Sequence, residues 1–236
     1  MRRFVLALIV SLPALVATGS GAAAPDPHAA FAADVAQYLA ESEARDPIFA
    51  DSIGVHTHDD QIADYSAAGI AASNAWAAAW RARINAFDPS KLSVDDAADR
   101  RTLLDNLDAQ SFEEGALHPE QTDPTLYVGV IGDAAYQLTS RDYAPLDERM
   151  HHVAARMRLI PQLVKDAEAN LTRPPLVFTQ LAVDQNAGNI DFYEHDVVDM
   201  SKSASAATHA AVVAALPSTI ASLQNLQAFL AGPLMK

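Results

Sequence analysis

The twenty residues from Asp46 to Tyr65 are the densest group of side chains in this sequence that could do chemistry. The segment reads DPIFADSIGVHTHDDQIADY and holds two histidines and five aspartates. Imidazole and carboxylate groups ligate metal ions, and they also bond to the backbone in tight turns and at helix ends. The segment is therefore either a functional site or a structural joint.

The pattern H-x-H-x-D, formed by His56, His58 and Asp60, makes this segment the best metal-binding candidate. Two imidazoles separated by one residue can reach one ion from an extended backbone, and Asp60 could add a carboxylate. The metallo-β-lactamase signature begins in the same way but requires a histidine where this sequence has Gln61. The alternative is a joint in which His56 and the neighbouring aspartates bond backbone groups and cap helices.

The joint is the favoured interpretation, and we expect this chain to bind no metal or other cofactor. Its side chains remain candidates for contact with a ligand. The candidate contacts are His56, His58, Asp59, Asp60 and Tyr65.

No complete catalytic motif occurs in the sequence. None of the eight histidines is followed by glutamate, so the zinc-hydrolase motif H-E-x-x-H is absent. The G-x-S-x-G elbow, S-x-x-K and the glycine-rich nucleotide motifs are absent too. We therefore assign no catalytic residue to this chain.

Helical periodicity runs through nearly the whole sequence and predicts the elements that must position this segment. Serine caps, prolines and Asp-Pro pairs predict where helices begin and end. The Leu146 to Ala167 stripe predicts one long helix kinked at Pro161. The predicted helices are about 31–45, 66–87, 93–115, 123–138, 146–167, 176–200 and 205–230, the last bent at Pro217.

No segment alternates with a period of two for long enough to predict a sheet. We expect one all-α domain of about seven to eight packed helices over residues 25–236. Residues 1–24 resemble a signal peptide, with Arg2 and Arg3 ahead of an apolar run and a region of small residues. The sequence contains no cysteine, so its own core must hold the domain together without disulfides.

The charge balance narrows the possible partners. Thirty acidic side chains face sixteen basic ones, a net charge of −14, and no basic cluster is longer than Arg100-Arg101. Nucleic acids and anionic membrane surfaces need clustered lysine or arginine, so neither is an expected partner. We expect an exported protein, periplasmic or extracellular, without a stable membrane anchor once the signal is cleaved.

An ordered set of short motifs resembles the bacterial family called domain of unknown function 885. The set comprises EARDP at 43–47, His56, Asp59, DYS at 64–66, RDYAP at 141–145, and Arg149 to Pro161. The resemblance implies an exported helical protein related to zinc metallopeptidases, with the H-E-x-x-H helix in a later half. It implies zinc only for that half, and it carries no zinc ligand over to any residue of this chain.

Three functions remain open at this stage, one of them a metal-binding enzyme that uses His56, His58 and Asp60. The favoured one is the non-catalytic, amino-terminal half of an exported metallopeptidase-like hydrolase, truncated before the H-E-x-x-H helix. Such a half would contribute cleft wall and packing, would meet a peptide substrate through the missing half, and would be inactive alone. The alternative is a self-contained periplasmic helical module that binds a ligand or partner. An exposed apolar stripe on the last helix, Ser205 to Leu230, would favour the non-catalytic half.

Overall fold

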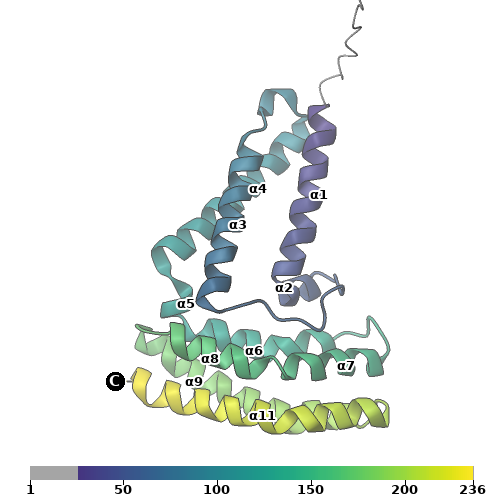
Figure 1. Cartoon of the computed structure of the whole chain (residues 1–236), viewed down its shortest axis with the longest axis vertical. Helices are drawn as coiled ribbons and strands as arrows, with labels where there is room; N and C mark the ends of the chain where they lie inside the picture. The colour runs from purple at the N-terminus through teal and green to yellow at the C-terminus, as the bar shows by residue number, and fades with distance from the viewer. Residues whose placement is uncertain (1–25, 236) are drawn as a thin grey trace, which may run out of the picture.

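The structure is a computed structural model that describes residues 26–235, and its helices form an arm standing on a base (Figure 1). Residues 26–235 contain eight α-helices of at least 11 residues, a few short helices and no β-strand. The predicted all-α class is confirmed. The predicted signal peptide, residues 1–24, lies outside the described residues.

The helices of the arm begin at the side chains that the sequence marks as caps. Ser66 Oγ accepts a hydrogen bond from the amide of Gly69, and Ser93 Oγ accepts one from the amide of Asp96. Each bond satisfies an amide that lacks a partner in the first turn. The reciprocal bond of a capping box is not formed at Ser93, because the Asp96 carboxylate pairs with His28 of α1 (Pro27–Arg45) instead.

The arm consists of α1 (Pro27–Arg45), α3 (Ala67–Asn85) and α4 (Val94–Phe112). These three helices enclose a small apolar core, and Arg83 of α3 pairs with Asp34 of α1 across its surface. Trp80 belongs to this core, whereas Trp76, one turn earlier, is only half-buried. The buried core residues are Phe31, Ala77, Trp80, Ile84 and Leu107.

The base consists of α6 (Pro124–Thr139), α7 (Leu146–Met157), α8 (Ile160–Asn170), α9 (Leu176–Asp191) and α11 (Ala206–Ala231). The last helix has the length and apolar composition to cross a membrane, and 39% of its apolar window is buried in this structure. It packs against α7, α8 and α9. Its apolar stripe faces inward, since Val212, Leu223 and Leu226 are fully buried.

Two predicted helices differ in detail from the structure. The long helix over 146–167 is in fact two helices, because α7 ends at Met157 and Pro161 lies in the first turn of α8. Proline has no amide to donate, so it is tolerated in a first turn, where that amide would lack a helical partner. The segment predicted as one helix from 176 to 200 stays helical but contains the π-helix η3 (Phe192–Val197) before α10 (Val198–Ser201).

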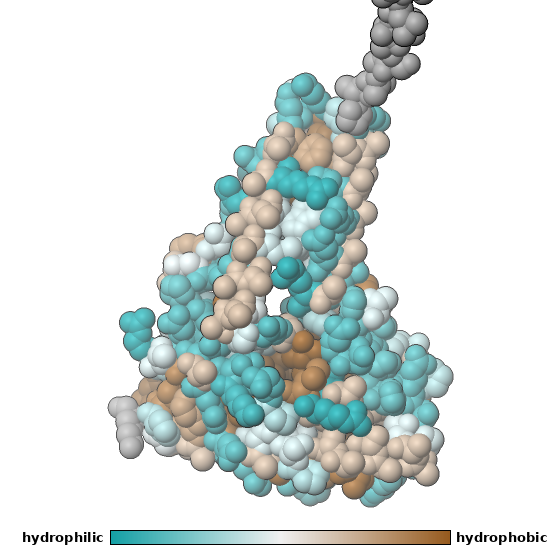
Figure 2. All heavy atoms as spheres, viewed as in Figure 1, coloured by the Kyte–Doolittle hydropathy of each residue, from teal (hydrophilic) through white to brown (hydrophobic). Residues whose placement is uncertain are grey.

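Arm and base meet through two connections. On one side, α2 (Pro47–Ser52) packs on α6 and leads into the connector, which we define as residues 53–65. On the other side, α4 runs into the π-helix η2 (Glu113–Leu117) and α5 (Pro119–Thr122), which also contacts α6. The surface is hollowed between these two connections (Figure 2).

Candidate functional site

A buried ion pair lies where α2 meets the base. Arg156 Nη1 lies 2.6 Å from Asp51 Oδ2, and both side chains are almost completely buried. Arg156 also donates from Nε to the carbonyl of Gln61 at 2.9 Å and from Nη1 to the carbonyl of Ala134 at 3.4 Å. One guanidinium of the base therefore holds both α2 and the connector.

Three further side chains complete what we call the charge cluster: His56, Asp59 and Tyr143. His56 Nδ1 lies 3.2 Å from Asp59 Oδ1, and the Tyr143 hydroxyl donates to Asp59 Oδ2. The rings of His56 and Tyr143 stack in parallel with centroids 3.4 Å apart. Asp59 is buried while His56 keeps one edge exposed, so the cluster is closed on the inside and open on one side.

The electrostatics of the cluster are dominated by Asp51. Burial raises the pKa of its carboxyl to about 6, and the nearby Asp59 adds to this, although Arg156 acts in the opposite direction. Neither Asp51 oxygen has a well-directed hydrogen bond, even though Oδ2 lies close to Arg156. The cluster thus contains two carboxylates and one permanent cation, which leaves one buried negative charge uncompensated.

The structure separates the residues that the sequence nominated. His56 and Asp59 lie in the charge cluster, whereas Asp60 is exposed and His58 is half-buried outside the cluster. The H-x-H-x-D set is not assembled among residues 26–235. The metal-capable group that forms there is instead Asp51, His56 and Asp59.

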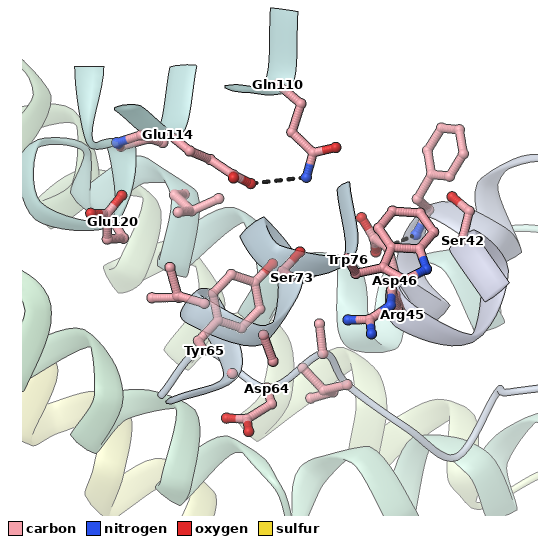
Figure 3. Close-up of a pocket in the computed structure, with 18 of the residues that line it drawn as sticks. Ser42, Arg45, Asp46, Asp64, Tyr65, Ser73, Trp76, Gln110, Glu114 and Glu120 are labelled. Atoms are coloured by element: carbon pink, nitrogen blue, oxygen red, sulfur yellow. Dashed lines mark hydrogen bonds between the residues drawn. The ribbon is translucent and has the colours of Figure 1, made fainter. Parts of the chain in front are cut away.

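The hollow between arm and base is a cleft of about 600 Å³ (Figure 3). Its walls come from the end of α1, the start of α3, the end of α4 with η2, and α5. The connector crosses its floor and presents Tyr65 and Asp64. The last of the five nominated residues, Tyr65, therefore lies in the cleft rather than in the charge cluster.

One side of the cleft is aromatic. Tyr38 stacks on Trp76 with centroids 5.4 Å apart and planes 13° from parallel, and the Arg45 guanidinium lies 4.9 Å from the Trp76 ring centroid. The indole N–H groups of Trp76 and Trp80 both donate to Glu41, and these bonds lower the pKa of the Glu41 carboxyl. This arrangement fixes the Trp76 ring at the edge of the cleft.

The opposite side of the cleft is acidic. Glu114 accepts a hydrogen bond from Gln110, and Glu120 lies on the neighbouring wall (Figure 3). The lining contains five carboxylates and a single permanent cation, Arg45. A cleft lined mainly by one sign of charge concentrates the field of those charges and attracts the opposite sign.

The floor of the cleft is anchored to the base. The Asn170 side chain donates to the carbonyl of Tyr65 at 2.8 Å and to the hydroxyl of Tyr127 at 3.0 Å. Burial raises the pKa values of both tyrosines, to about 12 for Tyr127, so both remain neutral phenols at physiological pH. Tyr65 thus offers the cleft a rigid ring and no charge.

A second surface feature lies on the base, where α6 and α9 run side by side. It is a shallow groove of about 360 Å³ whose lining includes Gly129, Gly132 and Gly188. Beside it, the first turns of α9 expose a row of large apolar side chains. The exposed residues are Leu176, Val177, Phe178 and Leu181.

The sequence reasoning missed three members of the charge cluster as site residues: Asp51, Tyr143 and Arg156. Asp51 lies inside the nominated segment but outside the H-x-H-x-D pattern. Tyr143 and Arg156 are more than 80 residues from Asp59 and Asp51, and no local pattern connects them. In the sequence, Tyr143 is marked only by the Arg-Asp-Tyr motif at 141–143. Arg156 is marked only by its place in the helix predicted from the Leu146 to Ala167 stripe.

Comparison with known proteins supports both the family and the fold. Residues 47–236 match the model of a family described as "Bacterial protein of unknown function (DUF885)". No curated protein matches the chain.

A solved structure from Shewanella oneidensis, described as "a putative lipoprotein of unknown function", superposes with a TM-score of 0.79 at 24% identity. The match covers 86% of this chain and 37% of that protein, so the chain spans little more than a third of its solved relative.

Proposed function

This chain belongs to the bacterial DUF885 family, and we propose that its helical unit forms one wall of the substrate cleft of an exported metallopeptidase-like hydrolase. The wall would bind and orient a peptide, and the hydrolytic centre would be carried by a further part of the longer family protein. In this view the chain alone binds peptide without cleaving it.

The cleft between arm and base is the observation that carries the proposal. Its volume of about 600 Å³ falls in the range of sites that enclose small ligands or a few residues of a peptide. Its lining joins a fixed aromatic wall around Trp76 to an acidic wall around Glu114. Aromatic faces contact apolar and cationic side chains, and carboxylates accept from peptide N–H groups and amines.

Two further observations support the assignment to a larger exported protein. The matched region forms 37% of the Shewanella oneidensis chain, so the same fold occurs there within a longer protein. That relative is described as a lipoprotein, a class that is exported. The absence of H-E-x-x-H from residues 1–236 is consistent with a catalytic centre elsewhere.

The alternative, a self-contained periplasmic module that binds a ligand or partner, is favoured by one observation. The stripe of α11 is buried against α7, α8 and α9 rather than exposed. A closed core of this kind is what an independently folding domain requires.

The exposed face of α9 favours the first proposal instead. Val177 is 65% exposed and Leu181 is 48% exposed, on the same helix whose later turns line the groove. Contiguous apolar surface of this type is typical of a face that another protein region covers. The larger protein would therefore have a surface of α9 on which to pack.

The test is to measure binding and hydrolysis on the same sample. The purified chain is incubated with a set of unstructured peptides, with and without added Zn²⁺, and the peptides are analysed by equilibrium dialysis and mass spectrometry. We expect saturable binding and intact peptides. Zinc-dependent hydrolysis would refute the proposal that the chain is non-catalytic. The absence of any peptide binding would refute the proposal that the chain forms a wall of the substrate cleft.

A further inference from the structure

We propose that Asp51, His56 and Asp59 form a zinc site that ties α2 to the connector where the arm meets the base. This assignment departs from the sequence-based expectation that the chain binds no metal, and it uses a different residue set from H-x-H-x-D. Each of the three side chains offers one ligand atom, and these atoms all lie within 4.8 Å of one another.

The distances fit a first-row metal ion with little movement. His56 Nδ1 lies 3.2 Å from Asp59 Oδ1 and 4.0 Å from Asp51 Oδ1. Tetrahedral zinc with ligands at about 2.0–2.2 Å places its ligand atoms about 3.3 Å apart. His56 and Asp59 are already at about that separation, and the Asp51 oxygen would have to move toward His56 by well under one ångström.

Asp51 supplies an independent sign that something is missing from the cluster. Its side chain is 0% exposed, and neither oxygen has a well-directed hydrogen bond. Arg156 contacts Oδ2, which leaves Oδ1 directed toward His56. A buried carboxylate oxygen without a partner destabilises the folded state, and a bound cation would remove that cost.

Each candidate ligand is held in place by a second group, as ligands in metal sites usually are. Arg156 holds Asp51 through Oδ2, and the Tyr143 hydroxyl holds Asp59 through its own Oδ2. The Tyr143 ring also stacks on His56 and fixes the plane of the imidazole. The Oδ1 atom of each carboxylate is not engaged by these groups, and both Oδ1 atoms lie within 4.0 Å of the same imidazole nitrogen.

The ligand set selects the kind of ion. One imidazole nitrogen and two carboxylate oxygens suit zinc, whereas magnesium and calcium prefer oxygen ligands alone. A water molecule can complete the coordination, because the His56 side chain is 21% exposed and provides a path from solvent.

The position of the site gives the ion a structural role. All three ligands lie on α2 and the connector, while the groups that orient them are Arg156 of α7 and Tyr143 of the loop before α7. A bound ion would tie α2 to the connector directly, and it would be linked to the base only through Arg156 and Tyr143. The connector also forms the floor of the cleft, so the ion would stiffen that floor.

The connector provides matched controls for a binding experiment. His56→Gln and Asp59→Asn remove proposed ligands, and His58→Gln and Asp60→Asn make the same chemical changes outside the cluster. The chain is freed of metal with EDTA, and Zn²⁺ affinity at pH 7.5 is measured by competition with a chromophoric chelator. Stoichiometry is measured by isothermal titration calorimetry, and circular dichroism in EDTA checks that each variant folds.

We expect one Zn²⁺ per chain, with affinity reduced by roughly 100-fold or more in His56→Gln and Asp59→Asn and unchanged in the two controls. Zinc should also raise the melting temperature of the wild type and the controls but not of the ligand variants. If a ligand variant does not fold, Tyr143→Phe keeps all three ligands and should weaken binding by about 10-fold or more.

Two results would overturn the assignment. One is a wild-type chain that binds no stoichiometric zinc. The other is a loss of affinity in His58→Gln or Asp60→Asn equal to that in the ligand variants, which would place the ion on the H-x-H-x-D set. Neither result bears on peptide binding in the cleft, so the zinc site and the proposed function can fail separately.

Discussion

Replacing Arg156 with methionine should be among the most damaging single substitutions in this protein. The Arg156 side chain is 1% exposed, pairs with Asp51, and donates to the carbonyls of Gln61 and Ala134. Methionine fills much of the same volume but leaves the Asp51 carboxylate buried without a cation. Removing one partner of a buried ion pair costs about 3–5 kcal/mol.

The two carbonyls that lose their donor add a further cost of about 1–3 kcal/mol. The expected loss for Arg156→Met is therefore about 4–8 kcal/mol, a large part of the roughly 5–15 kcal/mol that stabilises a typical domain. The double variant Asp51→Asn/Arg156→Met should recover about 2–4 kcal/mol of that loss, because it no longer buries an unpaired charge.

The assay is urea unfolding followed by circular dichroism at pH 7.5 in EDTA, for the wild type, both single variants and the double variant. The losses in unfolding free energy of the two single variants should not add up to that of the double variant, which should be more stable than Arg156→Met alone. A cost below about 1.5 kcal/mol for Arg156→Met, or simple additivity, would refute the view that this ion pair ties α2 to the base.

Three further substitutions, one of them with a matched control, test other parts of the structure. A Cβ on Gly69 would overlap the backbone carbonyl of Asp64, so Gly69→Ala should destabilise the fold by about 1–3 kcal/mol in urea unfolding. Gly129→Ala is the matched control: its Cβ meets open space, so it should stabilise the fold by up to about 1 kcal/mol. Burial raises the pKa of Asp133, so the folded state holds this proton more tightly than the unfolded chain, and stability falls as the pH rises from about 4 through the folded pKa. Asp133→Asn should therefore raise the melting temperature at pH 7 and leave it unchanged at pH 4; an equal shift at both pH values would contradict this. Leu181→Gln should change stability by less than about 0.5 kcal/mol and reduce binding of an apolar dye, because its side chain is exposed on α9.

Local signals in the sequence were sufficient to predict most helix positions. Ser66 and Ser93 cap α3 and α4 as expected, and Asp123-Pro124 begins α6. These features could be predicted because a cap and its amide lie within three residues of each other. The π-helices at 113–117 and 192–197 were not predicted, because one extra residue per turn leaves no distinct pattern in composition.

The candidate site could be predicted only in part, and for a physical reason. His56 and Asp59 were nominated because they lie together in a segment rich in polar residues, and the structure places them together. Arg156 and Tyr143 reach the cluster through tertiary packing of α7 and the loop before it, which no periodicity in a single sequence describes. The same limit applies to the cleft, since its walls come from four separate elements.

Peptide binding at Trp76 tests the central proposal most directly. Trp76 lines the cleft and Trp80 is buried in the arm, so the two single-tryptophan variants report on different places. Trp80→Phe leaves only the cleft reporter, and Trp76→Phe leaves only the core reporter. In a fluorescence titration with an unstructured peptide, a saturable change in Trp80→Phe and none in Trp76→Phe is the predicted result. No saturable change in Trp80→Phe, or equal changes in both variants, would contradict a peptide-binding wall in this cleft.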